Sequence, residues 1–419
     1  MPRSKVYWLP IDKVLSDHGV ELDGHGNTLK ALSPFRKSDN KNSFTVTISR
    51  NTFHDWKLDL CGGPVLFIEK LKGISEEEAV KYLEGVYFGK NVPDVKLVAP
   101  TAETQRPKPL DAEILDKAYR IFLSFCNLTA EDKKYLKKVR HLSDDEIEAV
   151  GFKTCPTRTI RHELHKALVA EGIEPETVPG FFRYSNDEYI TFSRYVGIII
   201  PVRNVDGKIV GLQIRKREVE EGDARYVWFS SAFAVNRQGE KAKYAVNGRS
   251  PESPVGFIPG RFWPSSTTTC MVTEGYFKAL AINKNIRCPA FSVQGVTNWR
   301  GILNGVGEII PYYEKLDRII LAFDADFISN LNVSKQLVKM YLALKERYPD
   351  LRYYVMMWDK DLGKGIDDLI ENVGSVKGYV SLVEAEVFAD VFEKFRPMGE
   401  QLEEKGLPIE NAFKKFLKI

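Results

Sequence analysis

Acidic residues that follow apolar segments are the side chains of this chain best suited to chemistry. Asp324 and Asp326 come directly after the apolar run RIILAF, and Glu274 comes directly after CMVT. Asp367 and Asp368 lie shortly after a third such run, YYVMMW. Two close carboxylates repel each other unless a cation lies between them, and carboxylate oxygens are ligands that Mg²⁺ prefers. The pattern therefore favours a site for Mg²⁺ or Mn²⁺.

A mostly parallel α/β sheet would bring these acids together. Residues 266–375 alternate strand-like and helix-like segments, which is the pattern of such a sheet. Ligands of open α/β sheets lie beyond the carboxyl ends of the strands, and alternation along an extended chain points Asp324 and Asp326 the same way. A lone Asp-x-Asp is more often a solvated loop or a helix cap. The prediction therefore rests on finding three acidic strand ends in one unit.

The three acidic segments also resemble the motifs of a known superfamily. VTEGYFKAL, FDAD and GKGIDDLI are similar, in this order, to the Toprim motifs of bacterial DnaG-like primases, over about residues 268–372. The resemblance implies that Asp324 and Asp326 ligate one Mg²⁺ and that Glu274 binds a second metal or orients the attacking hydroxyl. Asp367 or Asp368 would complete the site. Toprim modules also occur in topoisomerases and nucleases, so the module alone does not name the reaction.

A second resemblance to primases lies upstream of the acidic motifs. GIIIPVRNVDGKIVGLQIRKR is similar to the strand pair of the primase catalytic core, and ARYVWFSSA is similar to the segment that follows it. Basic side chains along two paired strands would bind nucleic-acid phosphates regardless of the base sequence. The alternative is that they form a solvated basic strand edge. The resemblance implies that the groove for template and nucleotide phosphates is lined by Arg203, Arg215, Lys216 and Arg217.

Two further lysines are candidates for phosphate contacts. Lys278 lies four residues after Glu274, which is one helical turn, and Lys364 precedes the last acidic pair. An ordinary surface position is the alternative for each of them.

Residues 1–90 resemble the primase zinc-binding domain in layout but not in ligands. The four ligand positions fall on or near Ser33, Arg36, Trp56 and Asp59, and none of these is Cys or His. Structural zinc needs four well-placed nitrogen or sulfur ligands, so no zinc is expected. We expect an aromatic core instead, formed by Phe35, Phe44, Phe53, Trp56 and Phe67.

The same N-terminal unit could still bind a single-stranded template. Exposed aromatic side chains stack on bases and neighbouring cations hold the backbone. The candidate cations are Arg36, Lys37, Lys41 and Arg50.

The segment order predicts a multidomain α+β and α/β chain. We expect a zinc-ribbon-like domain without zinc ligands over 1–90, a linker over 91–109 and a helical spacer over 110–180. Ser75, Thr129 and Ser143 are predicted helix N-caps because acids follow each of them closely. The N-terminal subdomain of the primase core, the Toprim domain and a helical tail would then occupy 181–265, 266–375 and 376–419.

Composition places the chain among globular proteins of the cytoplasm. Of its 419 residues, 43% are hydrophobic and 28% are charged, and the net charge is only +3. The five cysteines form no Cys-x-x-Cys pair, which is typical of reduced thiols. No apolar stretch reaches the length of a membrane span and no signal peptide is apparent. We therefore expect no membrane partner.

Together these features predict a primase-like enzyme that makes short RNA primers on single-stranded DNA from ribonucleoside triphosphates. The departures from a housekeeping primase suggest a phage, plasmid or other mobile element, and a separate replicative helicase is a candidate partner. Two alternatives remain open. One is a Toprim nuclease that uses the same carboxylates, and the other is a non-catalytic replication protein that binds single-stranded DNA.

Overall fold

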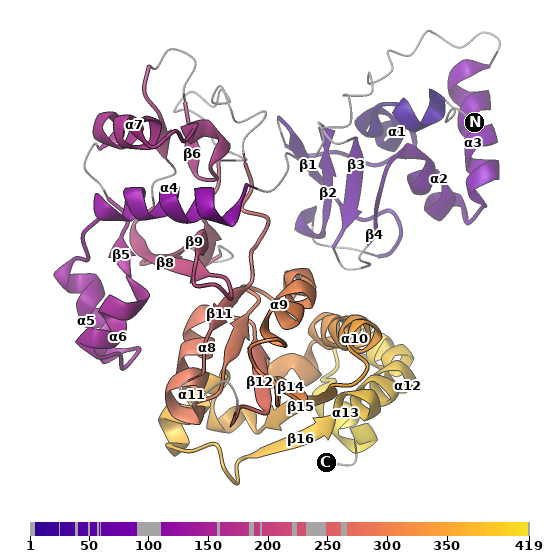
Figure 1. The fold of residues 1–419 in the computed structure, drawn as a ribbon. Coiled ribbons are helices and arrows are strands. Elements are labelled where there is room, and N and C mark those ends of the chain that lie inside the picture. The colour runs from indigo at the N-terminus through magenta and orange to yellow at the C-terminus, as the bar shows by residue number, and fades with distance from the viewer. Residues whose placement is uncertain are drawn as a thin grey trace. The chain divides into compact units, whose positions relative to one another are not determined.

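The computed structural model divides into two compact units, residues 1–108 and 109–419, and each is described by itself (Figure 1). The predicted linker 91–109, together with Arg50, Asp59 and Ala232, lies outside the described residues. The described residues are 5–24, 26–37, 41–48, 51–56, 58, 60–89, 110–156, 160–183, 188–192, 195–219, 224–231, 249–260 and 266–417.

The N-terminal unit is an antiparallel sheet that buries one face against helices. Buried and partly exposed residues alternate along the two central strands, so one face is covered. The helix that starts after Ser75 begins with a capping box between Ser75 and Glu78, which confirms that predicted N-cap. The strands, in sheet order, are β1 (Thr28–Ala31), β2 (Phe44–Thr47), β3 (Thr52–Asp55) and β4 (Leu60–Gly62). The helices are α1 (Ile11–Asp17), α2 (Pro64–Lys72) and α3 (Glu76–Phe88), with short 3₁₀ turns at Lys5–Trp8 and Lys41–Ser43.

Aromatic rings fill the core of this unit, as predicted, with one exception. Phe44 and Phe53 are stacked with ring centroids 5.5 Å apart, and Phe35 and Phe67 pack around them. The prediction that Trp56 belongs to the core was wrong, because 51% of its surface is exposed. Alternation along β3 turns Phe53 and Asp55 inward, so Trp56 faces outward. There its ring stacks on that of His54, with the ring centroids 3.7 Å apart.

The second unit begins with helices packed on a second antiparallel sheet. Its strands, in sheet order, are β10 (Tyr226–Trp228), β9 (Ile209–Lys216), β8 (Gly197–Arg203) and β5 (Lys153–Thr154). β8 and β9 form the predicted hairpin, and Thr129 and Ser143 cap their helices as predicted. The helices are α4 (Ala112–Ser124), α5 (Ala130–Lys138), α6 (Asp144–Val150) and α7 (Arg161–Ala170); a 3₁₀ turn at Pro175–Thr177 and a small ribbon of β6 (Phe181–Phe182) and β7 (Thr191–Phe192) follow.

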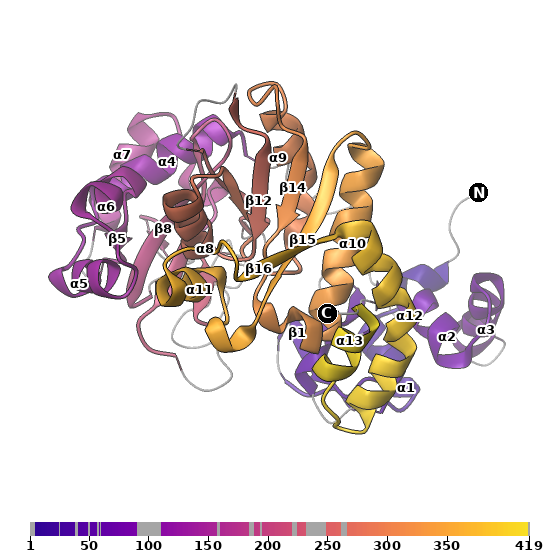
Figure 2. The ribbon, with the colours of Figure 1, turned by 90° about the horizontal axis from the view of Figure 1, so that it is seen from below.

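A six-stranded sheet forms the rest of the second unit, and its four central strands are parallel, as predicted. In sheet order the strands are β11 (Gly256–Ile258), β13 (Ala290–Ser292), β12 (Thr269–Thr273), β14 (Arg318–Leu321), β15 (Arg352–Trp358) and β16 (Val380–Glu384). One face packs against α8 (Tyr276–Ala281) and α11 (Ile366–Val373), and the other against α9 (Ile302–Ile309) and α10 (Leu331–Arg347) (Figure 2). A π-helical turn (Ile282–Ile286) follows α8, and short 3₁₀ turns lie at Trp299–Gly301, Ala325–Ser329 and Lys360–Leu362.

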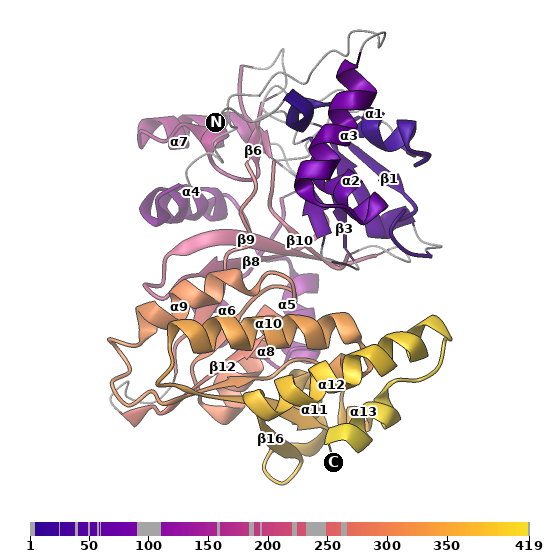
Figure 3. The same ribbon diagram turned by 90° about the vertical axis from the view of Figure 1, so that its right-hand side faces the viewer.

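The C-terminal residues complete this sheet and its core. The prediction of a wholly helical tail was wrong at residues 380–384, which form the antiparallel edge strand β16. α12 (Ala385–Glu404) and α13 (Glu410–Leu417) follow (Figure 3). They bury Phe388, Phe392 and Phe413 in the same apolar cluster as β12 and β14. Among the described helices of the chain, none combines the length and apolar character that a membrane crossing requires.

The buried aromatic core makes a direct prediction for the N-terminal unit. Phe53→Ala should lower the free energy of unfolding by about 3–5 kcal/mol, because Phe53 is fully buried among three rings. Native-state hydrogen exchange of the full chain measures this loss in the amides of α2 and β2. Phe88→Ala is the matched control, since Phe88 is 39% exposed at the end of α3. Equal losses in the two variants would contradict an aromatic core as the source of stability.

Candidate active site

The acidic residues predicted from sequence meet at the carboxyl ends of two neighbouring parallel strands. β12 pairs with β14 in register, with Val272 opposite Leu321, so the residues that follow each strand emerge side by side. Glu274 follows β12 and leads through an extended Gly275 into α8. Asp324 follows β14 and begins the 3₁₀ turn that carries Asp326. The parallel register thus explains why residues fifty positions apart share one site.

Two lysines neutralise this acidic cluster. Lys278 Nζ lies 2.9 Å from Glu274 Oε1 and also contacts Asp324 Oδ1. Lys364 Nζ lies 2.9 Å from Asp326 Oδ2. The two differ in exposure, because 20% of the Lys278 side chain is exposed against 64% for Lys364. Lys278 is therefore an internal partner of the acids, whereas Lys364 lies at the rim.

The pKa values of Asp324 and Glu274 shift in opposite directions. Burial, together with the neighbouring Glu274, raises the pKa of Asp324 to about 7. Burial also opposes the charge on Glu274, but Lys278, a hydrogen bond with Asp324 and the charge of Lys364 together hold the pKa of Glu274 below its ordinary value. An additional cation would favour the charged form of Asp324.

The third acidic segment reaches the cluster through a glycine-flanked loop. The amide of Ala325 donates to the carbonyl of Lys364 at 2.8 Å, which fixes this loop against the Asp324 turn. A Cβ on Gly365 would lie 2.4 Å from Asp367 Oδ1 and 2.8 Å from Lys278 Cε, so only glycine permits the observed approach. Asp368 accepts a hydrogen bond from the Gly365 amide at 2.9 Å and caps α11. The structure therefore gives Asp368 a helix-capping contact.

The donor set of the cluster suits a hard divalent cation. Every candidate ligand is a carboxylate oxygen, and Asp367 Oδ1 is buried without a hydrogen-bond donor. An unpartnered buried carboxylate oxygen is costly and is relieved by a cation. Among the residues that the structure describes, however, no three Asp, Glu, His or Cys side chains already converge in metal-binding geometry. Glu274, Asp324 and Asp326 are the residues that could hold an ion, after displacement of Lys364.

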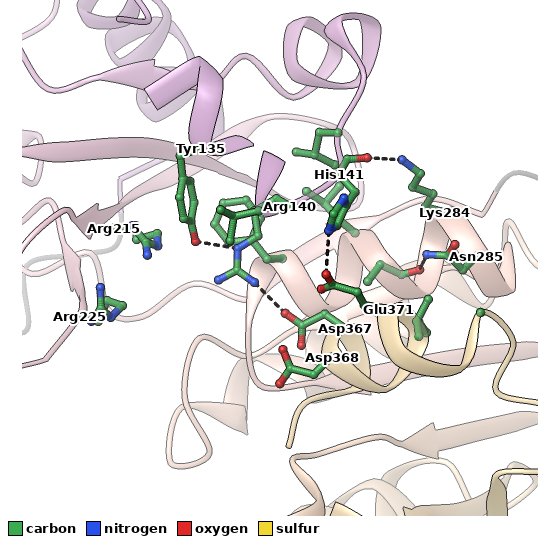
Figure 4. A pocket seen from close by; sticks show the side chains of 17 residues that line it. Tyr135, Arg140, His141, Arg215, Arg225, Lys284, Asn285, Asp367, Asp368 and Glu371 are labelled. Atoms are coloured by element: carbon green, nitrogen blue, oxygen red, sulfur yellow. Dashed lines mark hydrogen bonds and ion pairs between the residues drawn. The ribbon is translucent and has the colours of Figure 1, made fainter. Parts of the chain in front are cut away.

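A cavity of about 670 Å³ lies next to Asp367 and Asp368 (Figure 4). Its walls come from α5 and the loop after it, from the strand ends of β9 and β10, and from α8 and α11. Three arginines and three carboxylates line it, with Arg215 and Arg225 near one another in Figure 4 and Asp367, Asp368 and Glu371 in a row along α11. The lining residues are Tyr135, Val139, Arg140, His141, Leu142, Arg215, Arg225, Phe277, Leu280, Ala281, Lys284, Asn285, Asp367, Asp368, Ile370, Glu371 and Gly374.

Two of the cavity arginines are held in place by aromatic rings. Arg140 donates to the Tyr135 hydroxyl at 2.8 Å and to Asp367 Oδ2 at 2.9 Å, and its guanidinium lies 4.7 Å from the centre of the Phe277 ring. The guanidinium of Arg215 lies 4.0 Å from the Tyr135 ring centre. Arg215 Nε is buried and has no hydrogen-bond acceptor. An arginine with a buried, unused donor on a cavity wall is a ready partner for an anion.

The structure separates the four basic residues predicted on the strand pair. Arg215 lines the cavity, and Lys216 is not among the lining residues. Arg203 donates to the carbonyls of Gly207 and Val150 at 3.2 and 3.4 Å. Arg217 makes a two-pronged ion pair with buried Asp132, at 2.9 and 3.0 Å. These contacts tie Arg203 and Arg217 to the protein itself.

Sequence reasoning did not single out Arg140 and Arg225. Arg140 follows α5 and reaches Asp367 across 227 residues of sequence. Arg225 lies in the segment ARYVWFSSA, beside the strand β10 that pairs with β9. The signal that was available for Arg225 is its place in a segment that resembles the primase core.

Comparison with known proteins gives the chain relatives among DNA primases. Residues 262–377 match a family described as "Domain of unknown function (DUF3854)". The chain is 27% identical over 332 residues to a DNA primase of Thermotoga maritima, covering 75% of this chain and 50% of the relative. It is 26% identical over 301 residues to a DNA primase of Halalkalibacterium halodurans, covering 69% of this chain and 43% of the relative. The chain thus spans about half the length of these relatives.

Solved structures of primases also resemble the chain. A structure of the zinc-binding and RNA polymerase domains of the Aquifex aeolicus primase is 16% identical, with a TM-score of 0.46, and the match covers 96% of this chain and 89% of that one. A DnaG primase catalytic domain bound to single-stranded DNA is 13% identical, with a TM-score of 0.45, covering 69% of this chain and 85% of that one.

The tight contact at Gly365 predicts a selective loss of cation binding. Gly365→Ala should weaken Mn²⁺ binding about tenfold or more, because the added methyl group would press on Asp367 and push the loop away from the turn that carries Asp326. Isothermal titration of the full chain with Mn²⁺ measures the change. Gly85→Ala is the matched control, since a Cβ there meets no atom within 4 Å. Unchanged Mn²⁺ affinity in a folded Gly365→Ala variant would mean that this loop is not part of the site.

Proposed function

We propose that the chain is a primase-like nucleotidyltransferase that joins ribonucleoside triphosphates into short RNA primers on single-stranded DNA. The observation that carries the proposal is the position of the acidic cluster, with Glu274 and Asp324 at its centre, next to a cavity in which Arg215 has a buried, unused donor. Sequence similarity to DNA primases over three quarters of the chain supports it. On this proposal residues 266–375 are a Toprim domain and Asp326 completes its metal-binding set.

The cavity is the proposed site for the incoming nucleotide. About 670 Å³ is within the range of small-ligand sites, which is roughly 300–1,000 Å³. Arg215 and Arg225 would bind the triphosphate through charge-assisted hydrogen bonds. Tyr135 positions Arg215 by stacking, and Asp367 positions Arg140 by an ion pair. The apolar side chains of Phe277 and Leu280 would exclude water from the remaining wall.

The reaction forms one phosphodiester bond and releases pyrophosphate. The 3′-oxygen of the growing strand attacks the α-phosphorus of the incoming nucleotide, and the bond to the bridging oxygen of pyrophosphate breaks. When bound, a divalent cation supplies charge neutralisation at the phosphate and lowers the pKa of the attacking hydroxyl. Asp324 and Asp326 would hold that cation, and Glu274 would orient the hydroxyl. Lys364, which is largely exposed beside Asp326, would neutralise the departing pyrophosphate.

The N-terminal unit is the proposed contact for the template. Trp56 is half exposed beside its stacking partner His54, and Lys37 and Lys41 are exposed on the same unit. Bases stack on such rings while cations hold the backbone. Arg36 is better explained as a structural residue, because it lies 3.4 Å from Asp55, which has no exposed surface. On this proposal the Arg36–Asp55 pair and the aromatic core take the place of zinc.

The biological setting of the proposed enzyme follows from its differences from a housekeeping primase. A primase-like chain whose zinc-ligand positions carry other residues suits a phage, plasmid or other mobile element better than a housekeeping replication system. A separate replicative helicase would then be the partner that supplies single-stranded template. This setting and this partner both depend on the proposed activity.

Primer synthesis tests the proposal directly. The full chain should convert labelled ribonucleotides into short, template-dependent RNA on single-stranded DNA with Mg²⁺ or Mn²⁺. Asp326→Asn should slow synthesis by roughly a hundredfold or more, because a metal contributes several kcal/mol to the transition state. Asp350→Asn is the matched control, since Asp350 is an exposed aspartate beyond the far end of α10.

Two results of the same assay would overturn the proposal. Shortening of the template without synthesis, lost in Asp326→Asn, would make the chain a nuclease. Binding of the template with neither synthesis nor cleavage would make it a non-catalytic replication protein.

A further inference from the structure

We propose that the ammonium of Lys278 replaces a divalent cation between Glu274 and Asp324, so that this chain binds a single metal ion next to Asp326. The inference deepens the proposed function and rests on it for its biological meaning. It changes the expected composition of the site, because part of the charge that metal ions would balance is balanced by the protein itself.

The contacts of Lys278 are those of a built-in counter-ion. Its Nζ lies 2.9 Å from Glu274 Oε1 and contacts Asp324 Oδ1, so one ammonium bridges carboxylates from two different strand ends. Only 20% of its side chain is exposed, and Glu274 and Asp324 are similarly shielded at 22% and 15%. A buried ion pair of this kind is costly to break, because it would leave uncompensated charges. The bridge is therefore expected to persist.

The side chain of Lys278 is also fixed sterically. Its Cδ lies 3.8 Å from the position that a Cβ on Gly275 would take, and its Cε lies 2.8 Å from the corresponding position on Gly365. The lysine thus runs between two glycines, one before α8 and one before α11. A Cβ on Gly365 would be too close to the lysine stem, whereas the 3.8 Å at Gly275 is an ordinary van der Waals contact. This close packing at Gly365 and the low exposure of the side chain distinguish Lys278 from a flexible surface lysine.

Lys364 behaves differently and is the cation that a metal would displace. It pairs with Asp326 at 2.9 Å, but 64% of its side chain and 42% of that of Asp326 are exposed. An exposed pair contributes little to stability, so a metal ion can replace it readily. Once Lys364 has moved, three carboxylates and the ammonium of Lys278 leave two negative charges. One divalent cation balances them.

Counting bound Mn²⁺ tests this inference without any nucleotide or template. The wild-type full chain should bind one Mn²⁺, with the electron paramagnetic resonance spectrum of an isolated ion. Lys278→Met keeps the length of the stem but removes the charge, and it should bind two Mn²⁺ whose spectrum shows spin–spin coupling. Lys278→Arg should keep one ion. Lys364→Met is the matched control and should also keep one ion, because its lysine is at the exposed rim.

The outcomes separate this inference from the proposed function. Two coupled Mn²⁺ ions in the wild type would overturn it even if primers are made, and even if Lys278→Met does not fold. A single ion of unchanged affinity in a folded Lys278→Met variant would also overturn it. Absence of primer synthesis, with one ion in the wild type and two in Lys278→Met, would overturn the proposed function and leave this inference standing.

Discussion

Repulsion among carboxylates gathered at the ends of parallel strands is the constraint on which the rest of this structure depends. The register of β12 and β14 brings Glu274 and Asp324 together, and burial makes their shared charge costly. Lys278 at their centre and Lys364 at the rim offset part of the charge of the acidic cluster. Gly365 leaves space beside Lys278 that a methyl group would occupy.

The same electrostatic need connects distant parts of the second unit. Asp367 pairs with Arg140, which joins the end of α5 to the start of α11. That link places the arginine-lined cavity next to the acids, so the residues that stabilise the fold also form the wall of the proposed nucleotide site. In the N-terminal unit another ion pair joins Arg36, which follows β1, to buried Asp55 at the end of β3.

Local features of the sequence predicted the main elements of the fold and the grouping of the acidic residues. They did not predict side-chain contacts between residues far apart in sequence. The apolar run before Asp324 predicts both a buried strand and the direction of its acidic end, because both depend on neighbours in sequence. Trp56 was misplaced because its orientation depends on the exact register of β3. The contacts of Arg217 with Asp132 and of Arg140 with Asp367 depend on tertiary folding, so a basic residue in a basic segment does not reveal whether it faces a ligand or the protein.

Iron-directed cleavage of the full chain tests most directly whether the three acidic segments share one cation. Fe²⁺ bound in place of Mg²⁺, with ascorbate and peroxide, releases hydroxyl radicals that cut the nearby backbone, and mass spectrometry locates the cuts. The account predicts cuts near Glu274, near Asp324 and Asp326, and near Gly365, all suppressed by excess Mg²⁺ and absent in Asp326→Asn. Cuts confined to one segment, or cuts elsewhere that Mg²⁺ does not suppress, would contradict a shared metal site.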